Sequence, residues 1–264
     1  MRLGLIGYGN IAASLLDLLG PDLVQEVVVL VRRPLDDPPE GCIVVTEARA
    51  LIDAAPDLVV ECAGHGAVAA HGETILAAGI NLVVASVGAL ADARLYVRLQ
   101  TAAQHGGARL LIPSGAIGGL DLLEALALSG EVQIAYVGIK PPAAWRGTPA
   151  EDAGDLSALT CPLTVYTGGA REAARLFPRN SNVVAALALA GPGFEAVSVR
   201  LIADPAAVGN VHRYHVRSPD CRATVEIEGQ PSSGNGRTSR TTVYSLLREI
   251  RRAANSRHQH KHTA

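Results

Sequence analysis

Short aliphatic runs alternate with helical patterns over residues 1–110. The strand candidates are Arg2–Ile6, Val24–Val31, Asp57–Cys62, Ile80–Ser86 and Arg109–Pro113. Between them, apolar residues recur at helical spacing in Ile11–Leu19, 67–78 and 92–105. Continuous aliphatic strands separated by helices are typical of a parallel sheet that is covered on both faces. The pattern therefore predicts an α/β domain built on a doubly wound sheet.

The pattern changes after residue 112. Polar and apolar residues alternate in 131–139, 163–167, 195–203, 209–217 and 220–228, and helices are expected at Leu120–Leu128, 169–177 and 182–190. Alternation favours strands with one solvated face, so we predict an inserted α+β domain with an open, mostly antiparallel or mixed sheet. The helix at Thr241–Arg252 is expected to return to the first domain, and the polar tail 255–264 to be disordered.

These patterns give two predicted domains. Residues 1–111 with 235–264 form a dinucleotide-binding domain, and residues 112–234 form a substrate and oligomerisation domain. A solvated turn-rich stretch, 231–240, leads back to the first domain. Because an exposed apolar sheet face is often covered by a second subunit, we expect a homo-oligomer, most simply a dimer.

Composition narrows the function classes. The chain has 264 residues, of which 48% are hydrophobic and 18% charged, with a net charge of −2. This excludes a disordered chain and gives no electrostatic footprint for nucleic acid or an anionic membrane. No apolar stretch reaches the ~18 residues that a membrane helix needs. The four cysteines are scattered without a CxxC pair, which fits a reducing cytoplasm and indicates no zinc site.

A GxGxxA motif, Gly7-Tyr8-Gly9-Asn10-Ile11-Ala12, follows the first strand and opens the first helix. Gly7 permits a tight turn, and Gly9 lets the backbone approach a pyrophosphate, which the amides of Asn10 and Ile11 would meet. A glycine turn that serves packing alone is the other interpretation. In this strand–turn–helix context the motif predicts a Rossmann-type domain that binds NAD or NADP.

The second strand ends in Arg32 and Arg33, without the acidic residue that binds an NAD ribose. Either arginine could bind a 2′-phosphate, so we predict that NADP is accepted. A preference for NADP is one possibility, and Asp36 or Asp37 reaching an NAD ribose is another. A solvated basic loop remains a third interpretation.

Three further strand ends carry small residues and backbone amides: Glu61–His65, Ser86–Leu90 and Pro113–Gly119. Loops of this kind fit a flat ring and a small substrate, although tight packing would also select small residues. Glu61 could orient a site residue or only end its strand, and we favour the second.

Several longer motifs resemble the L-aspartate dehydrogenase family from Met1 to about Arg252. They are GYGNIA (7–12), VECAG (60–64), PSGAIGGLD (113–121), IKPP (139–142), LFPRNSNVVA (176–185), ADPAAVGNVH (203–212) and TSRTTVYSLLR (238–248). The resemblance implies an enzyme that oxidises L-aspartate to iminoaspartate, which yields oxaloacetate and ammonia or feeds pyridine nucleotide biosynthesis. It also implies His212 as catalytic acid/base, and Ala116 and Asn182 as cofactor-binding residues.

Amine oxidation removes a hydride from carbon and a proton from nitrogen, and histidine suits the proton step. His212 could act on the amine or on the water that attacks the imine, whereas His215 would point to the opposite face of its strand. Lys140, Ser114 and Arg179 are candidates to bind the substrate carboxylates, together with Asn210. Hydride transfer requires no metal.

Two other functions remain open on the sequence alone. A related NAD(P)-dependent reductase would act on a semialdehyde or a cyclic imine. A non-catalytic NAD(P)-binding regulator would keep the glycine turn but have no need of His212.

Overall fold

A computed structural model describes residues 1–178, 181–230 and 240–261, with only the backbone course given for 257–261. The chain divides into two compact units, Met1–Pro113 with Thr242–Ala264, and Ser114–Thr241. The 231–239 part of the predicted turn-rich stretch lies outside the described residues.

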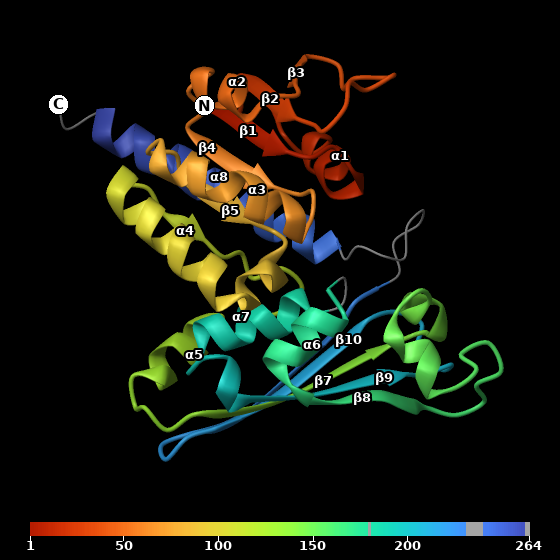
Figure 1. Ribbon diagram of the computed structural model, residues 1–264. Helices are drawn as coiled ribbons and strands as arrows, with labels where there is room; N and C mark the ends of the chain where they lie inside the picture. Colours follow the sequence, from red (N-terminus) through yellow and green to blue (C-terminus); the bar gives the residue numbers. More distant parts are fainter. Residues whose placement is uncertain (179–180, 231–239, 262–264) are drawn as a thin grey trace. The chain divides into compact units, whose positions relative to one another are not determined.

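The first unit is built on a six-stranded parallel sheet in the order β3-β2-β1-β4-β5-β6 (Figure 1). Its strands are β1 (Arg2–Ile6), β2 (Glu26–Leu30), β3 (Cys42–Val45), β4 (Leu58–Glu61), β5 (Leu82–Val84) and β6 (Leu110–Leu111). Strand order reverses beside β1, which pairs with both β2 and β4. In such sheets ligands bind outside the carboxyl ends of the strands at this reversal point.

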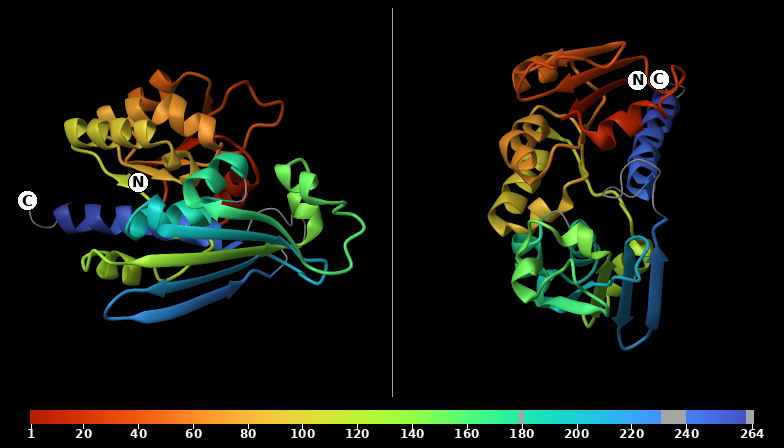
Figure 2. Two further views of the ribbon diagram at one scale, coloured as in Figure 1. Left: turned by 60° about the horizontal axis from the view of Figure 1, so that its bottom comes forward. Right: turned by 90° about the vertical axis from the view of Figure 1, so that its right-hand side faces the viewer.

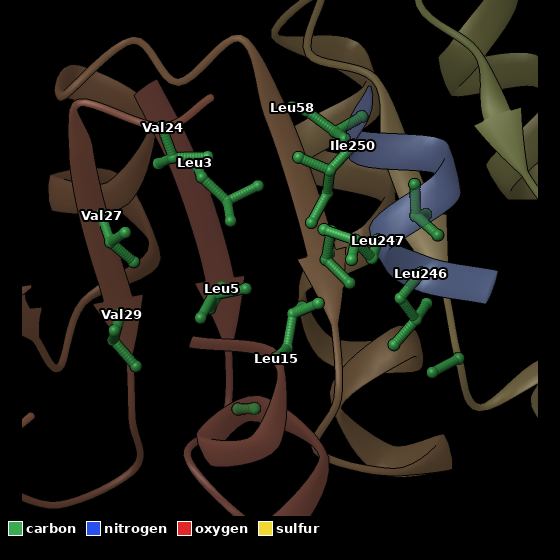
Figure 3. Close-up of a cluster of buried hydrophobic side chains, with 14 of the residues drawn as sticks. Leu3, Leu5, Leu15, Val24, Val27, Val29, Leu58, Leu246, Leu247 and Ile250 are labelled. Atoms are coloured by element: carbon green, nitrogen blue, oxygen red, sulfur yellow. The ribbon is translucent and has the colours of Figure 1, made fainter. Parts of the chain in front are cut away.

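Helices cover both faces of this sheet, as a doubly wound fold requires. They are α1 (Asn10–Leu16), α2 (Ala48–Asp53), α3 (His65–Ala77), α4 (Ala93–Gly106) and the final helix α8 (Arg240–Lys261). In Figure 2 α1 and α8 lie on one side of the sheet, and α3 and α4 on the other. Leu15 of α1 and Leu246 and Ile250 of α8 pack with Leu3 and Leu5 in one buried cluster (Figure 3).

The second unit holds a five-stranded mixed sheet in the order β11-β10-β7-β9-β8. Its strands are β7 (Gln133–Lys140), β8 (Leu163–Gly169), β9 (Val197–Ala203), β10 (Val211–Arg217) and β11 (Arg222–Glu228). The pair β7–β9 is parallel and the other pairs are antiparallel. Helices α5 (Leu120–Ala127), α6 (Ala170–Leu176) and α7 (Asn182–Ala190) lie over one face of the sheet (Figure 1).

Four short 3-10 helices complete the described elements: Val87–Ala91, Pro142–Trp145, Pro149–Ala153 and Phe194–Ala196. Among the helices that the structure describes, none combines the length and the apolar character that a membrane crossing requires.

The second face of the mixed sheet differs from the apolar face that the dimer argument assumed. Arg200 and His215 are exposed there, and Arg213 pairs with Glu226 of the neighbouring strand. Alternation along β9, β10 and β11 was predicted correctly. The outward positions of β10 and β11 are largely charged and polar, whereas Ala135, Val137 and Ile139 of the central strand β7 lie on the same face. The face is therefore mixed in character, and the dimer remains a prediction.

Two local expectations were wrong or incomplete. The tail was expected to be disordered from residue 255, yet α8 continues to Lys261. No glycine or proline interrupts this segment, so the helix can propagate beyond the residues that pack on the sheet. The sequence patterns also missed β3 and α2, whose apolar runs are short and only partly buried.

Candidate active site

The glycine turn joins the end of β1 to the start of α1. Gly7 has a φ of +88°, and a Cβ at this position would lie 2.6 Å from the Cβ of Ala63, which follows β4. Gly7 is therefore required both by its backbone conformation and by a close approach of two loops. A Cβ on Gly9 would meet nothing within 4 Å, so space is open in front of the backbone where a pyrophosphate would lie. These residues fit a dinucleotide.

Glu61 organises the loops beside this turn, a role that the sequence interpretation did not foresee. Its fully buried carboxylate accepts hydrogen bonds from the amides of Ala63 and Gly64, each at 2.7 Å, and from the amide and hydroxyl of Ser86, each at 3.0 Å. Burial raises the pKa of Glu61, and the hydrogen bonds from the backbone amides oppose that rise. One side chain thus ties the end of β4 to the end of β5.

Arg32 and Arg33 lie in an exposed bend directly after β2, with Asp36 and Asp37 also exposed in the same loop. The loop that selects between NAD and NADP therefore carries both exposed arginines, which could bind a 2′-phosphate, and exposed aspartates, which could bind a ribose hydroxyl.

His212 lies in the second unit, on the face of β10 that the helices cover. The side chain is only 5% exposed, and Tyr136 Oη lies 2.7 Å from its Nδ1. Burial lowers the pKa of His212 to about 3, with a smaller contribution from the positive charge of Lys140. The ring is therefore neutral at ordinary pH. His215 points to the other face, as expected, where its Nδ1 contacts Thr224 Oγ1 at 2.8 Å.

Lys140 ends β7 and is buried, so it is not a surface lysine. Its Nζ lies 5.7 Å from the centre of the Trp145 ring, within range of a cation–π interaction. Burial lowers its pKa to about 8. An ammonium group is a strong hydrogen-bond donor to a carboxylate.

The remaining candidates also lie in the second unit. Ser114 and Ala116 belong to one loop, in which the carbonyl of Ser114 accepts a hydrogen bond from the amide of Ile117 at 3.1 Å. Asn182 is the first residue of α7, and Asn210 immediately precedes β10. All four are half-buried. Arg179, the other carboxylate-binding candidate, lies outside the described residues. Within the described ranges, no three His, Cys, Asp or Glu side chains gather into a metal-binding cluster.

The low pKa of His212 predicts an acid-sensitive fold. The unfolded ring titrates near 6.5 and the folded ring near 3, so the folded state binds fewer protons between these values. The contribution of the neutral ring to the unfolding free energy is fully present above pH 6.5 and is lost as the pH falls toward 3. We expect the difference in unfolding free energy between wild type and His212→Gln to fall by about 2 kcal/mol from about pH 7 to about pH 5. Urea unfolding at both pH values measures it, and an unchanged difference would contradict a neutral buried ring.

Comparison with known proteins decides the family. Residues 121–253 match the family model described as aspartate dehydrogenase, C-terminal, and residues 7–113 match homoserine dehydrogenase, NAD binding domain. An L-aspartate dehydrogenase of Ruegeria pomeroyi is 47% identical over 95% of this chain and 92% of its own length. The chain belongs to the aspartate dehydrogenase family.

Other family members support the same membership. An L-aspartate dehydrogenase of Polaromonas is 42% identical over 95% of this chain and 96% of its own. The crystal structure of aspartate dehydrogenase from Thermotoga maritima matches with a TM-score of 0.77 and 32% identity, covering 96% of each chain. The Rossmann-like parallel sheet with a second mixed-sheet domain, expected from the sequence, is thus the fold of this family.

Sequence analysis of this family member missed two residues that shape its sites. Glu61 was expected to end its strand rather than to orient a site residue, and Tyr136 was not considered. A buried carboxylate directly before the small residues of VECAG was the available signal for Glu61. No local signal marks Tyr136, because its partner His212 lies 76 residues further along the chain.

Proposed function

We propose that the protein oxidises L-aspartate with NAD or NADP to iminoaspartate, which water converts to oxaloacetate and ammonia. The observation that carries this proposal is the buried neutral His212 beside Lys140, within the region that matches the aspartate dehydrogenase C-terminal model. The relatives named L-aspartate dehydrogenase, at 40–47% identity over nearly the whole chain, support the same activity.

Bound NAD(P) supplies the acceptor for the hydride that leaves Cα of the substrate. His212 is the acid/base group, and its neutral ring can take a proton from the substrate nitrogen or from the water that attacks the imine. The charge of Lys140 pairs with a substrate carboxylate, and Ser114 and Asn210 offer further polar contacts.

Gly7, Gly9 and the amides of Asn10 and Ile11 are the proposed cofactor-binding residues of the glycine turn. Ala116 and Asn182 are proposed as cofactor-binding residues on the resemblance to the family alone. Arg32 and Arg33 favour NADP, because their charges can pair with a 2′-phosphate. Michaelis constants for both cofactors test this preference, and NAD binding at least about tenfold better would contradict it.

A substrate panel tests the activity. Initial rates are compared for L-aspartate and L-homoserine with NAD or NADP, and for a cyclic imine with NADH or NADPH, because an imine must receive the hydride. The proposal expects L-aspartate to have the highest kcat/KM. A higher value for homoserine or the imine would favour the reductase alternative, and cofactor binding without turnover would favour the regulator.

Lys140 supplies a more specific prediction. Replacing it with Met keeps much of the side-chain volume but removes the charge, so KM for L-aspartate is expected to rise about 10-fold or more, while KM for the cofactor stays unchanged. Arg146→Met, an exposed cation in the following loop, is the control. An unchanged KM in Lys140→Met would remove this residue from the substrate site.

Three further properties belong to the same proposal. They are a cytoplasmic location, a role in pyridine nucleotide biosynthesis and a homodimer. Sedimentation of the purified protein tests the last, and a monomer at micromolar concentration would exclude it.

A further inference from the structure

A short loop brings Lys140 and Trp145 together. Lys140 is the last residue of β7, and Trp145 ends the 3-10 helix Pro142–Trp145 that follows it. The amide of Ala144 donates a hydrogen bond to the carbonyl of Pro141 at 3.0 Å, so the chain turns immediately after the strand. Two successive prolines fix two φ angles of this turn. The turn leaves Lys140 Nζ over the indole ring, 5.7 Å from its centre.

The indole ring has anchors of its own. Trp145 is fully buried, and its Nε1–H donates a hydrogen bond to the carbonyl of Ile202 on β9 at 3.2 Å. The ring of Phe177 meets it edge to face, with an interplanar angle of 89° and ring centres 5.8 Å apart. The hydroxyl of Thr148 donates to the backbone carbonyl of Trp145 at 2.6 Å. The ring is therefore held in place by neighbours other than the lysine.

Lys140 lies on the same face of the sheet as His212. Gly138 of β7 is directly opposite His212 of β10, and Lys140 is two residues further along the same face. Diagonal neighbours of this kind are about 7–8 Å apart, and the charge of Lys140 contributes to the low pKa of His212. Gly138 leaves room for the Tyr136 hydroxyl, since an added Cβ would lie 2.7 Å from its oxygen. A carboxylate bound to Lys140 would thus lie beside the histidine.

The indole ring favours carboxylate binding by Lys140 in two ways. Lysine has a flexible four-carbon stem, and holding its end in one place costs conformational entropy. A contact that holds the ammonium before the substrate arrives removes that cost from binding. The face of an indole also attracts a cation, which favours the charged amine, whereas burial favours the neutral amine and lowers the pKa of Lys140 to about 8.

We propose that Trp145 is a positioning residue, whose ring holds the Lys140 ammonium in place for one carboxylate of a dicarboxylic substrate. This inference rests on the proposed function and adds a residue that acts on the substrate through Lys140. Trp145 supplies no group to the proton or hydride transfer. Its loss is therefore expected to weaken substrate binding and to leave the chemical step unchanged.

Kinetics of two Trp145 variants test this division. Trp145→Leu removes the ring, and KM for L-aspartate is expected to rise about fivefold with kcat within about twofold of wild type. Trp145→Phe keeps a smaller ring, and its KM is expected to rise only about twofold. Phe194→Leu is the matched control, because the guanidinium of Arg171 lies 4.7 Å from the centre of that buried ring in the same unit. It is expected to leave KM unchanged.

A double-mutant cycle distinguishes positioning from a general packing role. If Trp145 acts through Lys140, Trp145→Leu added to Lys140→Met is expected to raise KM for L-aspartate no further than Lys140→Met alone. A second rise of about fivefold in the double variant would show independent effects and overturn the proposal. The same cycle with Trp145→Phe gives the answer if the leucine variant does not fold.

Tryptophan fluorescence provides a measurement that needs no turnover. Trp145 is the only tryptophan of the chain, so its emission reports on this ring alone. Succinate, which has the two carboxylates of aspartate without the amine, is titrated in the presence of saturating NAD or NADP. A saturable shift of the emission is expected, because a carboxylate at Lys140 compensates a charge close to the ring. The uncharged succinamide is expected to give no shift.

Lys140→Met is the decisive variant in this titration. It is expected to abolish the response at the same succinate concentrations. A wild-type protein that does not respond, or an equal response in Lys140→Met, would overturn the proposal.

The two kinds of measurement separate this inference from the proposed function. A succinate response that depends on Lys140, in a protein that does not oxidise L-aspartate, would overturn the function and retain the carboxylate site. Oxidation of L-aspartate with independent effects of Trp145 and Lys140 on KM would retain the function and overturn the positioning role.

Discussion

Replacing His212 with Ala is expected to lower kcat for L-aspartate oxidation by about 10²-fold or more, because the group proposed to take the proton from the reacting nitrogen or water is removed. The dissociation constant for NAD(P) is expected to stay within about twofold of wild type, since the residues proposed to bind the cofactor are unchanged. Steady-state kinetics and cofactor titration measure the two effects.

His215→Ala is the matched control for this prediction. His215 lies on the same strand, three residues away, but on the opposite face and exposed. Its replacement is expected to leave kcat unchanged. His212→Gln, which keeps a polar side chain in the buried position, guards against a packing defect. A His212→Ala enzyme within about threefold of wild type would contradict an acid/base role.

Gly7→Ala is expected to weaken cofactor binding on the order of 10²-fold and to destabilise the first unit by about 2–4 kcal/mol. The added Cβ would meet Ala63 at 2.6 Å, and the residue would also have to keep a φ of +88°. The turn must therefore move away from the position at which its backbone approaches the pyrophosphate. Titration with the reduced cofactor and urea unfolding measure the two effects.

Gly107→Ala separates the cost of a positive φ from the cost of a steric clash. Gly107 ends α4 with a φ of +65°, but a Cβ there would meet nothing within 4 Å. It is expected to cost only about 1 kcal/mol and to leave cofactor binding unchanged. If Gly7→Ala bound the cofactor as wild type does, the glycine turn would not be the dinucleotide site.

Local patterns predicted most of the fold because hydrophobic periodicity and glycine chemistry are encoded within a few residues. The aliphatic runs of β1, β2 and β4, and the alternation in β10 and β11, identified strands of the correct kind. The elements that the sequence did not predict depend on their surroundings in the folded chain. Strand β3 has four residues and little burial, and the end of α8 is helical beyond its packed portion.

The candidate site was only partly visible in the sequence for a similar reason. The resemblance to the family pointed to His212, and the spacing of the strand placed His215 on the other face. The contact of the Tyr136 hydroxyl, the space at Gly138 and the two hydrogen bonds from Ser86 to Glu61 arise only when distant strands pair. Such tertiary contacts leave no periodic signal.

The most direct measurement uses L-aspartate deuterated at C2. The account predicts that the deuterium appears on the nicotinamide ring of NAD(P)H, with one equivalent of ammonia formed for each reduced cofactor. Reduced cofactor without the label, or no reduction although the cofactor binds, would contradict hydride transfer from Cα of L-aspartate.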